Sequence, residues 1–377
     1  MDFGFTEEQE MLKKMARDFL TSRCPKKLVR EMEKDEKGYA PEIWKEMAEL
    51  GWMGLAFPEK YGGGDGTFLD LAVLLDEMGR ACLPGPFFPT VVLAGMAILE
   101  AGSETQKKEL LPQIAQGKLI ATLATTEDSP LYDASDISTS ASEESGNFVI
   151  NGTKLFVQDA QTADLIIVSA RTKKGSENKE GISLFLVKKG TAGVTTTPLM
   201  TIAADKQAEV VFNKVVVPKE NLLGELHNGW PVLGKVLQYA AAAKSVEMLG
   251  GVQQVLEMTV SYAKERVQFG KPIGTLQAIQ HYCADMAIDI DGCRLIIYQA
   301  AWALNENMPC AKEVALAKAW VSDAYQRCLI SAHQIHGAIG FTEDHDLPLY
   351  YRRAKAAELA FGDADVHRET VACEIGL

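Results

Sequence analysis

The sequence predicts a multidomain α+β protein that is mainly helical, because its hydrophobic period changes twice along the 377 residues. Residues 1–118 show a helical period, and residues 119–227 contain short runs rich in β-branched side chains. Residues 228–377 return to a helical period with few glycines or prolines, which predicts a bundle of long helices. These three ranges are the predicted domains.

In the first region, Thr6 and Gln9 stand at the spacing of a capping box, which predicts a helix start. A second helix start is predicted at Pro41. Apolar residues at spacings of three and four predict two stripes that face a core. The stripes are Leu12, Met15 and Phe19, and then Leu71, Leu74, Leu75 and Met78.

In the middle region, short β-rich runs predict strands over 165–168, 182–187 and 209–212. The pair Asn151-Gly152 predicts a hairpin turn, because both residues tolerate positive φ. The polar stretch 173–180 is expected to be a loop.

In the last region, one helical face is predicted to be apolar. It consists of Val314, Ala317, Val321, Ala324 and Cys328, and Gly337 and Gly340 break the pattern.

The composition narrows the class of protein. Lys and Arg number 38 against 51 Asp and Glu, and the net charge of −13 argues against nucleic acid or an anionic membrane as a partner. The longest apolar stretch, 91–99, is too short to cross a bilayer. No signal peptide is read, and the seven cysteines contain no CxxC pair, so a cytoplasmic protein with reduced thiols is expected.

Several motifs in a fixed order resemble the FAD-dependent acyl-CoA dehydrogenase family. They are Leu50–Gly54, Pro58–Gly63, Asn151–Lys154, Tyr262–Ile273 with Gln277–Gln280, Gln334–Thr342 and Arg352–Lys355. The resemblance covers essentially the whole chain. It implies an N-terminal helical domain, a middle β-barrel and a C-terminal four-helix bundle, with FAD bound at the subunit interface of a dimer or tetramer.

Five residues are candidates for binding the cofactor, and the resemblance implies that four of them match the group that the family gives to a neighbouring subunit's FAD; these four are Arg266, Phe269, Gln334 and Gly337. Arg266 is a forked cation that suits a pyrophosphate, and Phe269 offers an aromatic wall. Gln277 and Gln334 can donate and accept hydrogen bonds, as an adenosine or ribityl group requires. Gly337 allows a backbone to approach a ligand closely. These residues are the predicted cofactor-binding site.

The residue that would act as the base in this family is absent. Relatives carry a Glu seven residues beyond the Ala of the Arg-x-Ala-Lys motif, which is Ala354 here, and that position holds Phe361. A phenyl ring cannot accept the α-proton of an acyl thioester. The alternative position of the base in the family is Ala240, and Ala241 replaces an Arg that is common in relatives, which weakens the case for a CoA site. No catalytic residue is therefore assigned.

The flavin-facing motifs of the middle region also depart from the family. Relatives have Thr-Glu-Pro-Gly-Ala-Gly-Ser-Asp, and here the matching residues are Thr126–Asp133, with Tyr132 in place of a small residue. The usual Trp-Ile-Thr strand reads Phe156-Val157-Gln158. Residues that match a subunit's own flavin and substrate site are thus lost, whereas those that match a neighbour's FAD are kept.

Two further motifs indicate no site. The glycine-rich stretch 62–66 does not fit a phosphate-binding loop and is expected to be an ordinary loop. His333 and His336 stand three apart without a third ligand, so no metal is predicted.

The leading hypothesis is a non-catalytic subunit of a heterotetrameric acyl-CoA dehydrogenase, which completes the FAD site of a sister chain. The complex would act on an acyl-CoA and pass electrons to an electron-transfer flavoprotein. One alternative is an active homo-oligomer whose base is a repositioned acid such as Asp133, Asp363, Asp365 or Glu247. Another is a scaffold without flavin. The sequence does not specify the acyl group.

Overall fold

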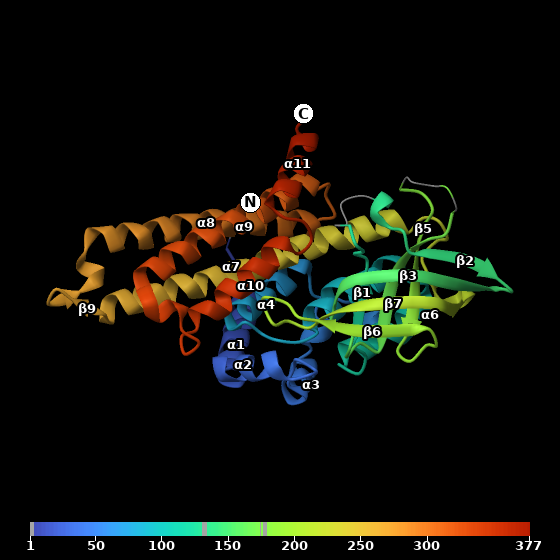
Figure 1. The fold of residues 1–377 in the computed structure, drawn as a ribbon, viewed down its shortest axis with the longest axis horizontal. Helices are drawn as coiled ribbons and strands as arrows, with labels where there is room; N and C mark the ends of the chain where they lie inside the picture. The colour runs from blue at the N-terminus through green and yellow to red at the C-terminus, as the bar shows by residue number, and fades with distance from the viewer. Residues whose placement is uncertain (1–3, 130–133, 174, 176–178) are drawn as a thin grey trace. The chain divides into compact units, whose positions relative to one another are not determined.

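The computed structural model describes residues 4–129, 134–173, 175 and 179–377. Its helices are α1 (Glu7–Arg23), α2 (Lys26–Lys34), α3 (Pro41–Glu49), α4 (Phe68–Ala81), α5 (Met96–Ala101), α6 (Glu104–Ala115), α7 (Gly229–Glu265), α8 (Gln277–Asn305), α9 (Ala311–His336), α10 (Leu347–Leu359) and α11 (Ala364–Glu374). Its strands are β1 (Ala121–Ala124), β2 (Ser140–Glu144), β3 (Asn147–Gln158), β4 (Leu165–Arg171), β5 (Ile182–Lys188), β6 (Val194–Leu199), β7 (Gln207–Pro218), β8 (Leu222–Leu223), β9 (Val267–Gln268) and β10 (Lys271–Pro272). The order helices, strands, helices is the predicted fold class (Figure 1).

The chain forms two compact units, each assembled from segments that are distant in sequence. The first comprises Met1–Arg30, Thr67–Leu83 and Ala241–Leu377, and the second comprises Glu31–Gly66 and Pro84–Ala240. The domain boundaries after residues 118 and 227 stay predictions.

The second unit is built on an eight-stranded sheet with the order β6-β7-β3-β2-β4-β5-β8, and β1 pairs with β4 in parallel. The predicted strands lie in β4, β5 and β7. Along β7, Ala208, Val210 and Phe212 are buried and the residues between them are partly exposed, which is the alternation of a sheet with one buried face. In β4 and β5 consecutive residues are buried on both faces.

The predicted hairpin at Asn151-Gly152 is wrong, because β3 runs straight through this pair. The chain turns instead at Ser145 and Gly146, whose φ angles of 49° and 82° join β2 to β3. Gly152 lies where the register of β3 on β7 shifts, so the pair forms a bulge. A Cβ on Gly152 would lie 2.4 Å from Thr139 Oγ1, and this close approach explains the glycine.

In the first unit, α1 begins with the predicted capping box. The Gln9 amide N–H donates to Thr6 Oγ1 and the Thr6 amide N–H donates to Gln9 Oε1, both at 3.2 Å. The predicted α1 stripe is shifted by one residue, because Ala16 and Leu20 are the fully buried positions and Met15 is 41% exposed. The predicted stripe of α4 is buried as expected.

Two glycines allow α7 to cross its neighbours closely. A Cβ on Gly250 would lie 1.8 Å from the Asp76 carbonyl oxygen of α4, and one on Gly251 would lie 2.4 Å from the Tyr325 hydroxyl of α9. The predicted apolar face of α9 is buried, and the helix ends at His336, directly before Gly337. In the part of the chain that the structure describes, no helix is long and apolar enough to span a membrane.

Candidate functional site

The five predicted cofactor residues gather at one end of the helices of the first unit, and we call this group the bundle-end site. It consists of Arg266, Phe269, Gln277, Gln334 and Gly337. Figure 1 shows the β9–β10 hairpin, which carries Phe269, at the end of α7 and α8.

A small apolar cluster holds this end together. Ala263 of α7, Ile273 after the hairpin and Ile335 of α9 are buried against one another. The Tyr262 ring stacks on the His336 ring with centroids 4.5 Å apart. The cluster therefore brings the end of α7, the start of α8 and the end of α9 together, although these segments are up to about 70 residues apart in sequence.

The hairpin turn places an aromatic residue in a backbone conformation that it does not favour. Phe269 and Gly270 have φ angles of 54° and 73° between the paired residues Gln268 and Lys271. A two-residue hairpin with positive φ at both positions favours Asn-Gly, and a phenylalanine there costs about 1 kcal/mol. The Phe269 side chain is also 90% exposed. Both features are unfavourable in the isolated chain and point to a binding role.

The polar members of the bundle-end site are free to contact a ligand. Arg266 is exposed and forms no ion pair with any residue that the structure describes. Gln277 is the first residue of α8 and Gln334 lies in the last turn of α9, and both are exposed. Gly337 has φ 65° and ψ −143°, and a Cβ added there would meet nothing within 4 Å. The space beside its backbone is open.

Histidines lie behind this site without forming a metal centre. His336 is buried, its Nδ1 donates to the Ala332 carbonyl oxygen at 2.8 Å, and its ring meets that of His345 with centroids 4.7 Å apart. Burial lowers the pKa of both His336 and His345. Across the described ranges, no group of His, Cys, Asp and Glu is arranged to hold a metal ion.

The turn between α10 and α11 carries Phe361, the position at which the sequence analysis expects a base in this family. Phe361 and Gly362 have φ angles of 59° and 93°. His367 Nε2 donates to the Phe361 carbonyl oxygen at 2.9 Å. The turn thus has a defined backbone, although the Phe361 side chain cannot accept a proton.

Lys318 of α9 fixes the same turn from inside the unit, a role that the sequence analysis missed. Its fully buried Nζ donates to the carbonyl oxygens of Glu358 and Gly362, both at 2.8 Å. Burial lowers the pKa of Lys318 to about 7, and the nearby Lys244 acts in the same direction. A lysine beside Val314, Ala317 and Val321 on an apolar face was the signal that could have shown it.

The acids considered as repositioned bases have structural partners. Asp363 caps α11 by accepting hydrogen bonds from the amides of Asp365 and Val366. Asp365 pairs with Arg368 at 2.6 Å, and Glu247 pairs with Lys244. Asp133 lies outside the described residues.

The alternative position that the sequence analysis considered for the base is apolar and buried. Ala240 and Ala241 of α7 are 0% and 2% exposed. Neither residue offers a proton acceptor or a cation.

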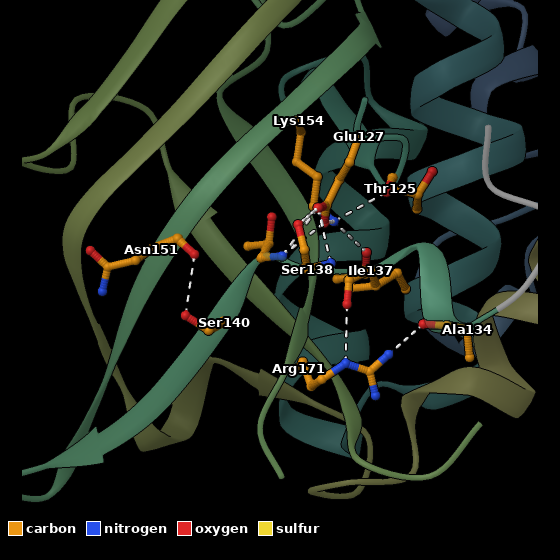
Figure 2. Close-up of polar contacts among 11 residues, drawn as sticks. Thr125, Glu127, Ala134, Ile137, Ser138, Ser140, Asn151, Lys154 and Arg171 are labelled. Carbon is orange, nitrogen blue, oxygen red and sulfur yellow. Dashed lines mark hydrogen bonds and ion pairs between the residues drawn. The ribbon is translucent and has the colours of Figure 1, made fainter. Parts of the chain in front are cut away.

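In the second unit, Glu127 of the flavin-facing motif is part of a buried ion pair, which Figure 2 shows. Lys154 Nζ donates to Glu127 Oε1 at 2.7 Å, to Ser169 Oγ at 3.1 Å and to the Thr125 carbonyl oxygen at 3.1 Å. The Glu127 carboxylate also accepts the amides of Ser138 and Thr139. The carboxylate thus joins the buried Lys154 side chain to the backbone of Ser138 and Thr139.

The pair has shifted pKa values. Burial lowers the pKa of Lys154 to about 8, against the opposing effect of Glu127. Burial alone would raise the pKa of Glu127, but Lys154 and the hydrogen-bond donors outweigh it and lower that pKa. The lowered pKa makes the Glu127 carboxylate a weaker base, and its hydrogen bonds and its ion pair with Lys154 give it a structural role.

The remaining flavin-facing positions offer little. Phe156 has φ 54° and is 57% exposed in the irregular part of β3, and Gln158 accepts a hydrogen bond from Thr122 through its carbonyl oxygen. Tyr132 lies outside the described residues. The glycine-rich loop folds onto its own neighbours, because a Cβ on Gly63 would lie 2.0 Å from the Phe57 carbonyl oxygen.

Comparison with known proteins agrees with this fold. Three family models match the chain: the acyl-CoA dehydrogenase N-terminal domain over residues 6–118, the middle domain over 122–215 and the C-terminal domain over 227–376. A probable acyl-CoA dehydrogenase, YngJ of Bacillus subtilis (strain 168), is 35% identical over 382 residues, which cover 100% of both chains.

Two solved structures show the same architecture. The butyryl-CoA dehydrogenase of Megasphaera elsdenii superimposes with a TM-score of 0.93 at 31% identity, over 100% of both chains. The ChsE4–ChsE5 complex of Mycobacterium tuberculosis contains a chain that superimposes with a TM-score of 0.90 at 28% identity, over 100% of this chain and 99% of that one. The chain therefore belongs to the acyl-CoA dehydrogenase family.

Proposed function

We propose that this chain is the non-catalytic subunit of a heterotetrameric acyl-CoA dehydrogenase and that its bundle-end site completes the FAD site of a sister chain. The observation that carries the proposal is the contrast between two places in the first unit. The bundle-end site keeps all its predicted residues, exposed, whereas the turn at Phe361 keeps its backbone and lacks the base.

The bundle-end residues suit the adenosine diphosphate half of FAD. Arg266 would bind a phosphate, Phe269 would pack on the ligand, and Gln277 and Gln334 would hydrogen-bond its polar edges. The open space beside Gly337 would accept a group close to the backbone. When bound, FAD supplies the acceptor for the hydride that leaves the acyl-CoA, and the sister chain would supply the base.

Several finer statements belong to this proposal. Because the ChsE4–ChsE5 structure is named as a complex of two proteins, a heteromeric assembly has a precedent among the similar structures. The substrate class is an acyl-CoA, the electron acceptor is an electron-transfer flavoprotein, and the compartment is the cytoplasm. The proposal also includes domain boundaries after residues 118 and 227.

The test compares the chain alone with the chain in its natural complex. A tagged copy is purified from its own host under native conditions, its co-purifying chains are identified by mass spectrometry, and FAD per chain and acyl-CoA turnover are measured. We expect a sister acyl-CoA dehydrogenase chain, FAD and turnover in the complex, and little FAD and no turnover in the chain alone. A flavin-saturated, active homo-oligomer would refute the proposal, and a colourless complex would favour the scaffold alternative.

A further inference from the structure

The bundle-end hairpin carries cations that the predicted site did not include. Lys264, at the end of α7, and Lys271, the first residue of β10, are exposed like Arg266. Between residues 264 and 271 the only carboxylate is Glu265. Residues 264–271 thus carry a net positive charge in a chain whose net charge is −13.

The described part of the chain offers these cations no partner. Within the ranges that the structure describes, none of Lys264, Arg266 and Lys271 forms an ion pair or a side-chain hydrogen bond. Surface cations that cluster without carboxylate partners repel one another, and a bound anion relieves that repulsion.

The register of the hairpin places Lys271 beside Arg266. Lys271 is directly opposite Gln268, and the Ile273 amide donates to the Arg266 carbonyl oxygen at 2.8 Å, so Ile273 is opposite Arg266. Opposite residues and alternate residues of a hairpin share a face. Arg266, Gln268, Lys271 and Ile273 therefore share one face of the hairpin.

That face is turned toward the other cofactor residues. Ile273 is buried against Ile335, which directly follows Gln334 and lies two residues before Gly337. The two cations consequently emerge on the side of the hairpin that faces the end of α9. Lys264 belongs to the last turn of α7 and is not one of the residues that pair across the hairpin.

We infer that Lys271 is a second phosphate-binding residue, which acts with Arg266 on the diphosphate of a dinucleotide. The inference rests on the proposed function and adds a residue to it. Each of the two phosphates of such a ligand carries a negative charge at neutral pH, so a single arginine leaves one charge without a partner. A charged hydrogen bond from Lys271 would supply it.

The test uses the natural complex after FAD has been removed, titrated with FAD, ADP and adenosine. Lys271→Gln should weaken FAD and ADP binding about tenfold, leave adenosine binding unchanged within about twofold, and reduce the salt dependence of ADP binding. Lys271→Arg should restore the affinity for both. Lys264→Gln is the matched control, since it removes the same charge from the neighbouring helix.

The possible outcomes distinguish an error in the assignment of Lys271 from an error in the proposed function. If the unaltered complex binds FAD and Lys271→Gln binds it equally well, the assignment of Lys271 is wrong and the proposed function stands. Equal losses in Lys264→Gln and Lys271→Gln would show a general field effect and would also overturn the assignment. If the unaltered complex binds no FAD, the proposed function itself fails.

Discussion

Lys318 Nζ lies 2.8 Å from the carbonyl oxygen of Gly362, the residue that follows Phe361 in the turn between α10 and α11. The same nitrogen lies 2.8 Å from the Glu358 carbonyl oxygen of α10. One buried amine therefore donates hydrogen bonds both to a carbonyl oxygen at the end of α10 and to one in the turn that follows it. Lys318 and His367 hold the turn through the carbonyl oxygens of Gly362 and Phe361, and these contacts do not depend on which side chain stands at position 361.

We expect Lys318→Met to lower the free energy of unfolding, because the carbonyl oxygens of Glu358 and Gly362 lose their buried donor. It should also change the pH dependence. The pKa of Lys318 is about 7 in the folded chain and 10.5 when unperturbed, so the unfolded chain binds more protons between these values. The stability of the unaltered protein should therefore rise with pH in this window, by at most about 1.4 kcal/mol per pH unit.

Urea unfolding at pH 6.5, 8 and 9.5 measures both effects. The rise between pH 7 and 10 should be smaller in Lys318→Met by the part that Lys318 supplies, whereas the part due to Lys154, whose pKa is lowered to about 8, should remain. The neighbouring His367, whose pKa is lowered by burial to about 4, titrates below this window and cannot supply the rise. An unchanged slope in the variant would show that Lys318 is not the titrating group.

The sequence predicted the helices better than the turns, for a physical reason. A capping box such as that of Thr6 and Gln9 is closed by residues three apart, so local sequence determines it. Asn151-Gly152 has the local chemistry of a hairpin, but the close approach of Thr139 and the pairing of β3 with β7 make it a bulge. Tertiary packing decided the outcome there.

The candidate site shows the same contrast between what the sequence predicts and what only tertiary packing determines. Family motifs located Arg266 and Gly337, and a cluster formed by Ala263, Ile273 and Ile335 brings them to one end of the helices. Lys318 was missed because a lysine in an apolar helical stripe reads as an interruption of the pattern. Only the folded chain shows the two carbonyl oxygens that it satisfies.

A second prediction concerns Asp76, which is 3% exposed in α4. Burial raises its pKa to about 6, and Glu77 acts in the same direction. The folded chain thus holds a proton more tightly than the unfolded chain, and stability is lost as pH rises from about 4 through 6. Asp76→Asn should increase the free energy of unfolding at pH 8 by up to about 3 kcal/mol, with the gain disappearing near pH 4.

Glu77→Gln is the contrasting variant, to be measured in the same urea series. Glu77 accepts two hydrogen bonds from Arg17 of α1, at 2.7 and 2.8 Å. Its neutralisation should lower the free energy of unfolding by about 1–3 kcal/mol. A destabilised Asp76→Asn at pH 8 would contradict the assigned pKa.

A third prediction concerns the buried pair of the second unit. Lys154→Met leaves the Glu127 carboxylate buried without its cation and should cost about 3–5 kcal/mol of stability. The double variant with Glu127→Gln should lose less than Lys154→Met alone, because no buried charge is then left unpaired. Urea unfolding of both single variants and the double variant gives the coupling energy, and additive losses would rule out the pair as a unit.

The last prediction separates binding from stability at Phe269. Its φ of 54° and 90% exposure are both unfavourable in the free chain, whereas asparagine before Gly270 suits the turn. Phe269→Asn should therefore raise the free energy of unfolding of the isolated chain by about 1 kcal/mol, and it should lower the FAD content of the complex. Denaturant unfolding and flavin absorbance measure the two quantities. If phenylalanine served the hairpin itself, the variant would lose stability as well as flavin, and the strain would then have no link to binding.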